Sequence, residues 1–143
     1  MYTQKLIDKY FNLAKNASTF SDYPKIHIGA VMIYKNKILT MGYNTTKSNP
    51  MQKEFNKYRN IDEREFDINS HPNATHAEMA CLLSTRHLDI DWNKVSIFVY
   101  SERSDGCTRL VRPCKACSKG LDERGIKDWY YTTDNGYAYE RRD

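Results

Sequence analysis

Two short motifs of this chain place metal-binding side chains and a carboxylate at spacings that suit one zinc site. His76 and Glu78 belong to the first motif, and Cys114 and Cys117 form a later Cys-x-x-Cys pair. An imidazole and two thiolates are ligands that zinc accepts, and as a set of three they leave a fourth position for water. These ligands together cancel the charge of Zn²⁺, and we expect the metal to lower the pKa of a water in the fourth position toward about 7.

Glu78 is the residue that gives the predicted metal site a reaction. A carboxylate beside an activated water can accept its proton and return it to a ring nitrogen and to a departing amine, as hydrolytic deamination requires. His-x-Glu alone is a weak signal, and Cys-x-x-Cys alone also fits redox motifs and structural zinc ribbons. The two motifs together, in this order and with Pro113 before the first cysteine, predict a catalytic zinc site.

The remaining cysteines leave an alternative open. Cys107 could join His76, Cys114 and Cys117 in a closed structural site with four protein ligands, and a site that binds no metal is a further alternative. Cys81 is expected to be a small residue of the core.

Helix N-termini are predicted to bring the two motifs together. Pro113 suits the first turn of a helix in which Cys114 and Cys117 share one face, and the free N–H groups and dipole at this end stabilise thiolates. His76 and Glu78 would diverge beside a long helix, so we expect the zinc to lie beyond the N-terminal end of theirs.

The other elements follow from capping residues, apolar periodicity and turn signals. Asn73 or Thr75 can cap the helix of the first motif, which should extend to about residue 87, and Gly125 suits the end of the second helix. Gly29 and Ala30 lie inside a predicted strand and leave room for a close approach. We expect a helix over residues 3–16 capped by its first residue, a hairpin of 26–34 and 38–43, strands at 95–100 and 126–132, a small hairpin in 102–112, and a turn at 134–136 before a last short strand at 137–140.

Residues 45–72 form an excursion that is too long for a plain connection and too polar for a core strand. Asn49 and Pro50 predict a short inserted helix that places Met51, Phe55 and Tyr58 on one face. The first half of the excursion is net basic and the second half net acidic. This segregation predicts either a solvated, self-pairing loop or a contact with substrate or a second subunit.

Length and composition predict one cytoplasmic domain. Residues 1–143 are enough for a single domain with its own core, and the formal charge of +4 is compatible with an anionic ligand without requiring one. The first ten residues contain charges and no uninterrupted apolar run, and no window approaches membrane-spanning length. In a reducing cytosol the cysteines are expected to be thiols or metal ligands.

At the residues of the two motifs the chain resembles the zinc-dependent cytidine and deoxycytidylate deaminase superfamily. The resemblance also includes the hairpin with Gly29 and Ala30 and the run Gly42-Tyr43-Asn44, and it covers about residues 26–133. It implies an α/β three-layer sandwich with a mixed five-stranded sheet, in the order 2-1-3-4-5, flanked by helices. It also implies that one zinc ion is bound by His76, Cys114 and Cys117.

The resemblance implies roles for further residues. Glu78 would shuttle protons, the Ala77 backbone N–H would bind the base carbonyl, Asn44 would contact the sugar and Ala30 would form the floor of the base pocket. A turn residue that ends the second strand is the alternative for Asn44. His71 is expected to be a loop histidine satisfied by water or backbone.

Two segments depart from the family pattern. Residues 102–112 are longer than the usual link into Pro-Cys and bring Arg103, Arg109 and Arg112 near the metal-binding helix, where one of them could contact a phosphate or all could be solvated. Because the segment after Gly136 is short, we expect an antiparallel last strand, as in free-nucleoside deaminases.

The leading hypothesis is therefore a zinc-dependent hydrolase that converts a cytosine nucleoside or nucleotide, of the CMP or dCMP type, to its uracil form with release of ammonia. One alternative is a cytosine or adenine deaminase of single-stranded DNA or RNA, in which Tyr131 would flank the pocket. The other is a non-enzymatic, zinc-stabilised binding module. Family members often form dimers or tetramers, so a homo-oligomer is an expected partner state.

Overall fold

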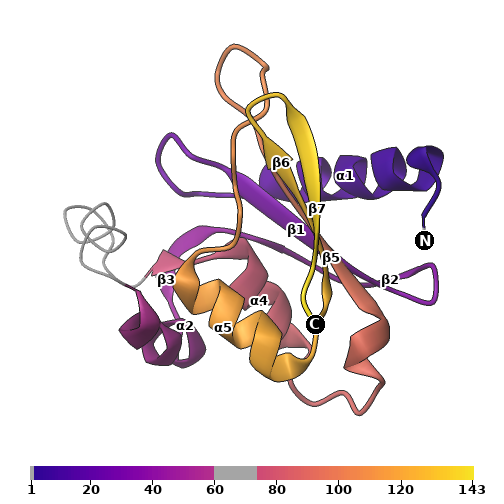
Figure 1. Ribbon diagram of the computed structural model, residues 1–143. Helices are drawn as coiled ribbons and strands as arrows, with labels where there is room; N and C mark the ends of the chain where they lie inside the picture. Colours follow the sequence, from indigo (N-terminus) through magenta and orange to yellow (C-terminus); the bar gives the residue numbers. More distant parts are fainter. Residues whose placement is uncertain (1, 60–73) are drawn as a thin grey trace.

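The computed structural model describes residues 2–59 and 74–143, and its centre is a mixed five-stranded sheet (Figure 1). The strands are β1 (Ile28–Tyr34), β2 (Lys37–Tyr43), β5 (Val95–Ser101), β6 (Asp128–Thr133) and β7 (Gly136–Arg141). They lie in the order β2-β1-β5-β6-β7, and the β5–β6 pair is parallel whereas the other three pairs are antiparallel. Counted within the sheet this is the predicted order 2-1-3-4-5, and the predicted antiparallel last strand is confirmed.

Helices cover both faces of the sheet, which confirms the three-layer sandwich (Figure 1). Successive strand residues point to opposite faces, so Val31 and Ile33 pack with α1 (Gln4–Ser18), while Ala30 and Met32 pack with α4 (Ala77–Ser84) and α5 (Lys115–Arg124). The metal-binding motifs are therefore carried by the layer formed by α4 and α5.

The N-terminal helix α1 lies directly against β1 because one strand position lacks a side chain. The Thr3 hydroxyl accepts a hydrogen bond from the Leu6 N–H and caps the helix, as predicted. A Cβ atom at Gly29 would lie 1.9 Å from the Ala14 carbonyl oxygen. The close approach that the sequence predicted at this position is that of α1.

The first hairpin has the two-residue turn that a right-handed strand twist favours. Lys35 and Asn36 adopt φ values of 52° and 62°, which is the type I′ combination between antiparallel strands. The predicted polar turn is confirmed, with strands that begin at residues 28 and 37.

Helix α4 begins later and ends earlier than predicted. Its cap is His76, and Thr75 instead lies in β4 (Ala74–Thr75), which pairs with β3 (Thr45–Ser48). The Thr75 hydroxyl donates to the Lys47 carbonyl at 2.6 Å, so it is engaged by the excursion and cannot cap the helix. The expected cap at Thr75 is therefore wrong, and Asn73 lies outside the described residues.

Helix α5 also begins later than predicted, at Lys115. Cys114 is its N-cap, so Pro113 stands just before the helix and not in its first turn. Gly125 ends the helix with a φ of 95°, in the left-handed conformation predicted for it.

The excursion contains the predicted short helix. In α2 (Pro50–Phe55) the Asn49 side chain accepts from the Gln52 N–H at 2.7 Å, and a 3₁₀ turn η1 (Asn56–Tyr58) follows. The acidic second half of the excursion lies outside the described residues, as does His71.

Two further connections complete the chain. A 3₁₀ turn η2 (Trp92–Lys94) leads into β5, and the predicted small hairpin is reduced to a bridge between Glu102 and Thr108. None of the helices in residues 2–59 and 74–143 combines the length and apolar character that a bilayer-spanning segment needs.

Candidate metal centre and active site

Three potential zinc ligands from the two motifs meet in one place. The Nδ1 atom of His76 lies 3.4 Å from the Sγ atom of Cys114 and 3.4 Å from that of Cys117, and all three donor atoms lie within 4.8 Å of one another. Tetrahedral zinc with ordinary Zn–N and Zn–S bonds separates nitrogen and sulfur ligands by about 3.5 Å. The donor types and their spacing therefore fit one zinc ion.

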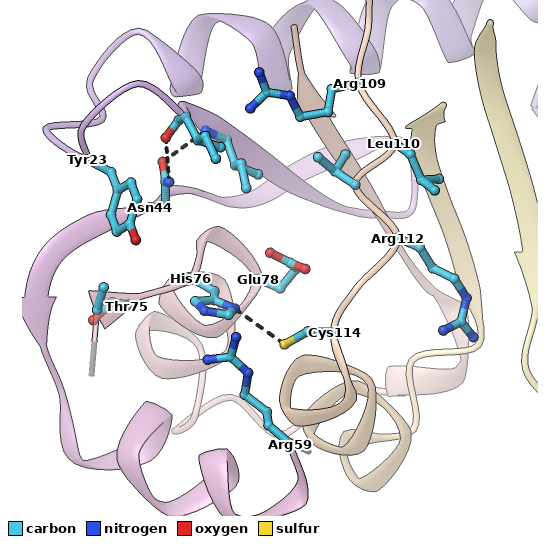
Figure 2. Close-up of a pocket in the computed structure, with 14 residues that line it drawn as sticks. Tyr23, Asn44, Arg59, Thr75, His76, Glu78, Arg109, Leu110, Arg112 and Cys114 are labelled. Carbon is cyan, nitrogen blue, oxygen red and sulfur yellow. Dashed lines mark hydrogen bonds between the residues drawn. The ribbon is translucent and has the colours of Figure 1, made fainter. Parts of the chain in front are cut away.

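Both metal-binding helices point their N-termini at this group, as the sequence predicted. His76 is the N-cap of α4, Cys114 is the N-cap of α5, and Cys117 lies in the first turn of α5. Figure 2 shows the His76 ring turned toward the Cys114 sulfur from the helix opposite. Free N–H groups and helix dipoles at both ends favour thiolate ligands here.

The other cysteines lie apart from this group. Among the described residues the donor cluster consists of His76, Cys114 and Cys117, whereas Cys107 is exposed in the segment before Pro113. The four-ligand alternative with Cys107 therefore has no support in the described chain. Cys81 is fully buried beside the Ala30 carbonyl, as predicted for a small core residue.

Gln52 of α2 fixes the backbone of His76. Its side-chain oxygen accepts the His76 N–H at 2.9 Å, and its side-chain nitrogen donates to the Asn56 side-chain oxygen at 2.8 Å. Gln52 has no solvent exposure, so each of these groups depends on the other. The sequence carries no signal for this role of Gln52, because the apolar face predicted for α2 gives no partner for a glutamine beside it.

The two thiols carry different proton affinities. The pKa of Cys114 is lowered, chiefly because the Cys117 thiol donates a hydrogen bond to it and the His76 imidazole lies beside it. The pKa of Cys117 rises, because this thiol donates that hydrogen bond and is fully buried. A metal needs both sulfurs as thiolates, so metal binding at this pair would displace the proton that the two sulfurs share.

Glu78 is buried next to the donor group. It lies in the first turn of α4 with 5% of its surface exposed. Its pKa is raised to about 7, chiefly by burial; the His76 imidazole lowers it in part, and the neighbouring Cys114 sulfur adds a smaller upward shift. A carboxyl group with this pKa can both accept and release a proton near neutral pH.

A cavity of about 280 Å³ opens onto His76, Glu78 and Cys114 (Figure 2). Its described lining combines apolar groups with arginines, and Glu78 is the carboxylate among them. The other lining residues are Tyr23, Ile26, Ile28, Asn44, Arg59, Ala74, Thr75, Arg109, Leu110, Val111 and Arg112. The cavity therefore offers an apolar wall, a proton-transfer group and positive charge to one ligand.

Asn44 lines this cavity and also anchors the chain. Its side-chain oxygen accepts from the Ser21 hydroxyl and from the Ile28 N–H, and its side-chain nitrogen donates to the Ile26 carbonyl at 2.8 Å. These bonds fix the end of β2 against the chain before β1. The side-chain nitrogen retains a second hydrogen that can serve a ligand.

The remaining predicted binding residues are not among the described residues that line this cavity. Ala30 and Ala77 are fully buried, in β1 and at the first position of α4. Tyr131 is in the core at 9% exposure, and its hydroxyl donates to Glu140 at 3.1 Å. Their roles toward a substrate stay predictions.

A family model covers nearly all of the chain. The model described as the cytidine and deoxycytidylate deaminase zinc-binding region matches residues 3–133, which include both motifs. No curated protein sequence matches significantly.

Solved structures of such deaminases are similar in fold. The dCMP deaminase from the cyanophage S-TIM5, in complex with dCMP and dUMP, is 20% identical over 93% of this chain and 85% of that chain, with a TM-score of 0.65. The cytidine deaminase from Burkholderia pseudomallei is 18% identical over 94% of this chain and 91% of that chain, with a TM-score of 0.62. At these identities the likeness shows the shared fold.

The match to the family model, the shared fold and the grouping of His76, Cys114 and Cys117 agree with one another. The chain belongs to the cytidine and deoxycytidylate deaminase family.

Proposed function

We propose that the protein is a zinc-dependent hydrolase that deaminates a free cytosine nucleoside or nucleotide, of the CMP or dCMP type, to its uracil form with release of ammonia. The observation that carries the proposal is the buried Glu78 carboxyl at the wall of a cavity that also reaches His76 and Cys114. Family membership supports this reaction class.

His76, Cys114 and Cys117 hold the metal in this account. When bound, zinc supplies Lewis-acid activation of water at neutral pH. The Glu78 carboxylate accepts one proton from the attacking water and delivers it to the ring nitrogen of the base. It then transfers the remaining hydroxyl proton to the departing amine, so that the carbon–nitrogen bond breaks with release of ammonia. Burial raises the pKa of Glu78, which brings the protonated form closer in free energy to the ionised form.

The predicted binding residues complete the proposal. The Ala77 N–H, at the first position of α4, would donate to the base carbonyl, and Ala30 would lie beneath the base. Asn44 would reach the sugar through the second hydrogen of its side-chain nitrogen, since the Ile26 carbonyl occupies the first. Tyr131 would contribute indirectly, by holding neighbouring groups of the site in position.

The relatives support a small pyrimidine substrate. The cyanophage enzyme is a dCMP deaminase bound to dCMP and dUMP, and the Burkholderia enzyme is a cytidine deaminase. One of these proteins thus acts on a nucleotide and the other on a nucleoside, and the proposal for this chain includes both substrate types.

The test is incubation of zinc-loaded protein with cytidine, deoxycytidine, CMP and dCMP, followed by ammonia measurement and mass spectrometry of the base. We expect the mass increase that accompanies replacement of an amine by a carbonyl. Glu78→Gln, which is nearly isosteric, should retain zinc and lower turnover at least about 100-fold. Exposed Glu123 provides the matched control, and Glu123→Gln should keep wild-type turnover. Unchanged turnover in Glu78→Gln would contradict the proposal.

A further inference from the structure

Two of the three arginines before Pro113 have partners elsewhere in the fold. A terminal nitrogen of Arg103 lies 2.8 Å from the Asp134 carboxylate. Arg112 donates to both carboxylate oxygens of Glu140, at 2.9 Å and 2.8 Å. These ion pairs join the segment to the β6–β7 hairpin. The charge of each of these two guanidinium groups is therefore balanced by a carboxylate.

Arg109 differs from both. Its side chain lines the cavity that contains Glu78, and its Nη1 atom is buried without a hydrogen-bond partner in the described part of the chain. A buried guanidinium nitrogen without an acceptor carries an uncompensated desolvation cost. A ligand with anionic oxygen atoms would remove this cost by accepting the hydrogen bond.

The backbone around Arg109 holds the residue in place. Its N–H donates to the Ser101 carbonyl at 3.0 Å, and its carbonyl accepts from the Thr132 hydroxyl at 2.8 Å. On either side, the Thr108 hydroxyl donates to the Thr133 carbonyl and the Val111 N–H donates to the Thr132 carbonyl. Arg109 is thus fixed to the carboxyl ends of β5 and β6, as a preorganised binding residue requires.

The charge of the cavity favours an anion at this place. The described lining residues include Arg59, Arg109 and Arg112 against the single carboxylate of Glu78. The charge of Arg112 is balanced by Glu140 outside the lining, whereas no carboxylate in the described residues pairs with Arg109. In Figure 2, Arg109 extends from the segment that enters α5, on a different side of the cavity from His76 and Glu78.

From these observations we propose that Arg109 binds the phosphate of a cytosine 5′-monophosphate, and that the protein therefore selects nucleotides over nucleosides. This inference rests on the proposed function. The base would occupy the end of the cavity at Glu78, and the phosphate would accept a charge-assisted hydrogen bond from the Nη1 atom of Arg109.

Phosphate oxygens could come from a free monophosphate or from the backbone of a single strand. The cavity, at about 280 Å³, is slightly smaller than the usual range of small-molecule sites, about 300–1,000 Å³. This size favours the free nucleotide, and a cytosine-containing oligonucleotide serves as the competing arm of the test.

The test compares kcat/KM for dCMP with that for deoxycytidine, and for CMP with cytidine. Wild type should prefer the monophosphates, and Arg109→Gln should reduce that preference about 10- to 100-fold, the effect of a charge-assisted hydrogen bond. Arg109→Lys keeps the charge and should fall between the two. Arg103→Gln is the matched control, because Arg103 pairs with Asp134 and is absent from the described cavity lining, and it should keep the wild-type preference.

Several outcomes would overturn the inference. They are a wild-type preference for nucleosides, an equal preference in wild type and Arg109→Gln, or turnover confined to cytosines within the oligonucleotide. Nucleoside turnover without a monophosphate preference would leave the proposed function standing, whereas absence of turnover on every cytosine substrate would remove the proposed function itself. If Arg109→Gln fails to fold, the comparison of kcat/KM for monophosphates and nucleosides in the wild-type protein still tests the predicted selection of nucleotides.

Discussion

At the residue scale, three side chains from distant parts of the sequence supply donors that suit zinc, and a fourth supplies a proton acceptor. The spacing of His76, Cys114 and Cys117 suits a zinc ion, since both nitrogen–sulfur distances are 3.4 Å. Glu78 contributes differently, because burial holds its carboxyl group near the pKa that proton transfer at neutral pH needs. In the proposed function, metal binding and reaction therefore depend on different residues of the same site.

The first prediction separates the cysteines. Cys114→Ala removes one donor of the set and should lower the zinc content from one ion per chain to well below that after dialysis against a chelator. Cys107→Ser should retain one ion per chain, because Cys107 is exposed and lies outside the donor group of the described residues. Metal analysis of the purified variants provides the measurement. Loss of zinc from Cys107→Ser would contradict this prediction and support the alternative of a closed site with four protein ligands.

The sequence predicts such residues well when their chemistry is rare and their spacing local. Cysteine pairs and a His-x-Glu motif signal metal and proton transfer before the fold is known. The partners of Asn44 and the isolation of Arg109 depend instead on contacts between residues far apart in the chain. The sequence offers Arg103, Arg109 and Arg112 as equals, and the contacts of the folded chain distinguish them.

At the element scale, the excursion is a support for the metal centre. Helix α2 sends Gln52 to the backbone of His76, and β3 pairs with β4 directly before that residue. Two contacts thus determine where α4 begins. The sequence predicted α2 from its Asn-Pro cap but not the β3–β4 pairing, because each strand is short and carries no apolar alternation. The predicted cap of α4 at Thr75 is wrong for the same reason, because Thr75 belongs to the unpredicted strand β4.

The second prediction tests this support. Gln52→Ala leaves the buried His76 N–H and the Asn56 side chain without their partner, which should lower the free energy of unfolding by about 2 kcal/mol. The melting temperature should fall by about 4–8 °C, and zinc affinity should weaken with it. Lys53→Ala, on the exposed side of the same helix, should leave both unchanged. Equal melting temperatures for Gln52→Ala and wild type would show that α2 does not support the site.

At the scale of the whole molecule, the C-terminal hairpin forms one edge of the sheet and is joined by one carboxylate to the segment before α5. Glu140 accepts hydrogen bonds from Arg112, before α5, and from Arg142 and Tyr131. The predicted antiparallel strand β7 thus has its position fixed by charge as well as by backbone pairing. The hydrogen bonds from Arg112, followed by those from Arg142, lower the pKa of Glu140 to about 2.

The third prediction concerns acid stability. Because the pKa of Glu140 is lower in the folded chain than the ordinary value of 4.5, its contribution is complete above about pH 5 and is lost as the pH falls toward 2. Glu140→Gln should therefore lower the free energy of unfolding at pH 7 by about 1–2 kcal/mol. Its difference from wild type should shrink between pH 5 and pH 2 in denaturant titrations. A difference that is constant across this range would mean that the carboxylate charge does not contribute.

The most direct test of the central claim, hydrolysis at the zinc centre with Glu78 as the proton carrier, is isotope labelling. The best cytosine nucleoside or monophosphate would be incubated with zinc-loaded protein in ¹⁸O-labelled water, and the product analysed by mass spectrometry. The account predicts one labelled oxygen in the uracil ring of the wild-type product, and a large loss of labelled product in zinc-loaded Glu78→Gln. A uracil product without label, or equal labelling rates in the two proteins, would contradict it.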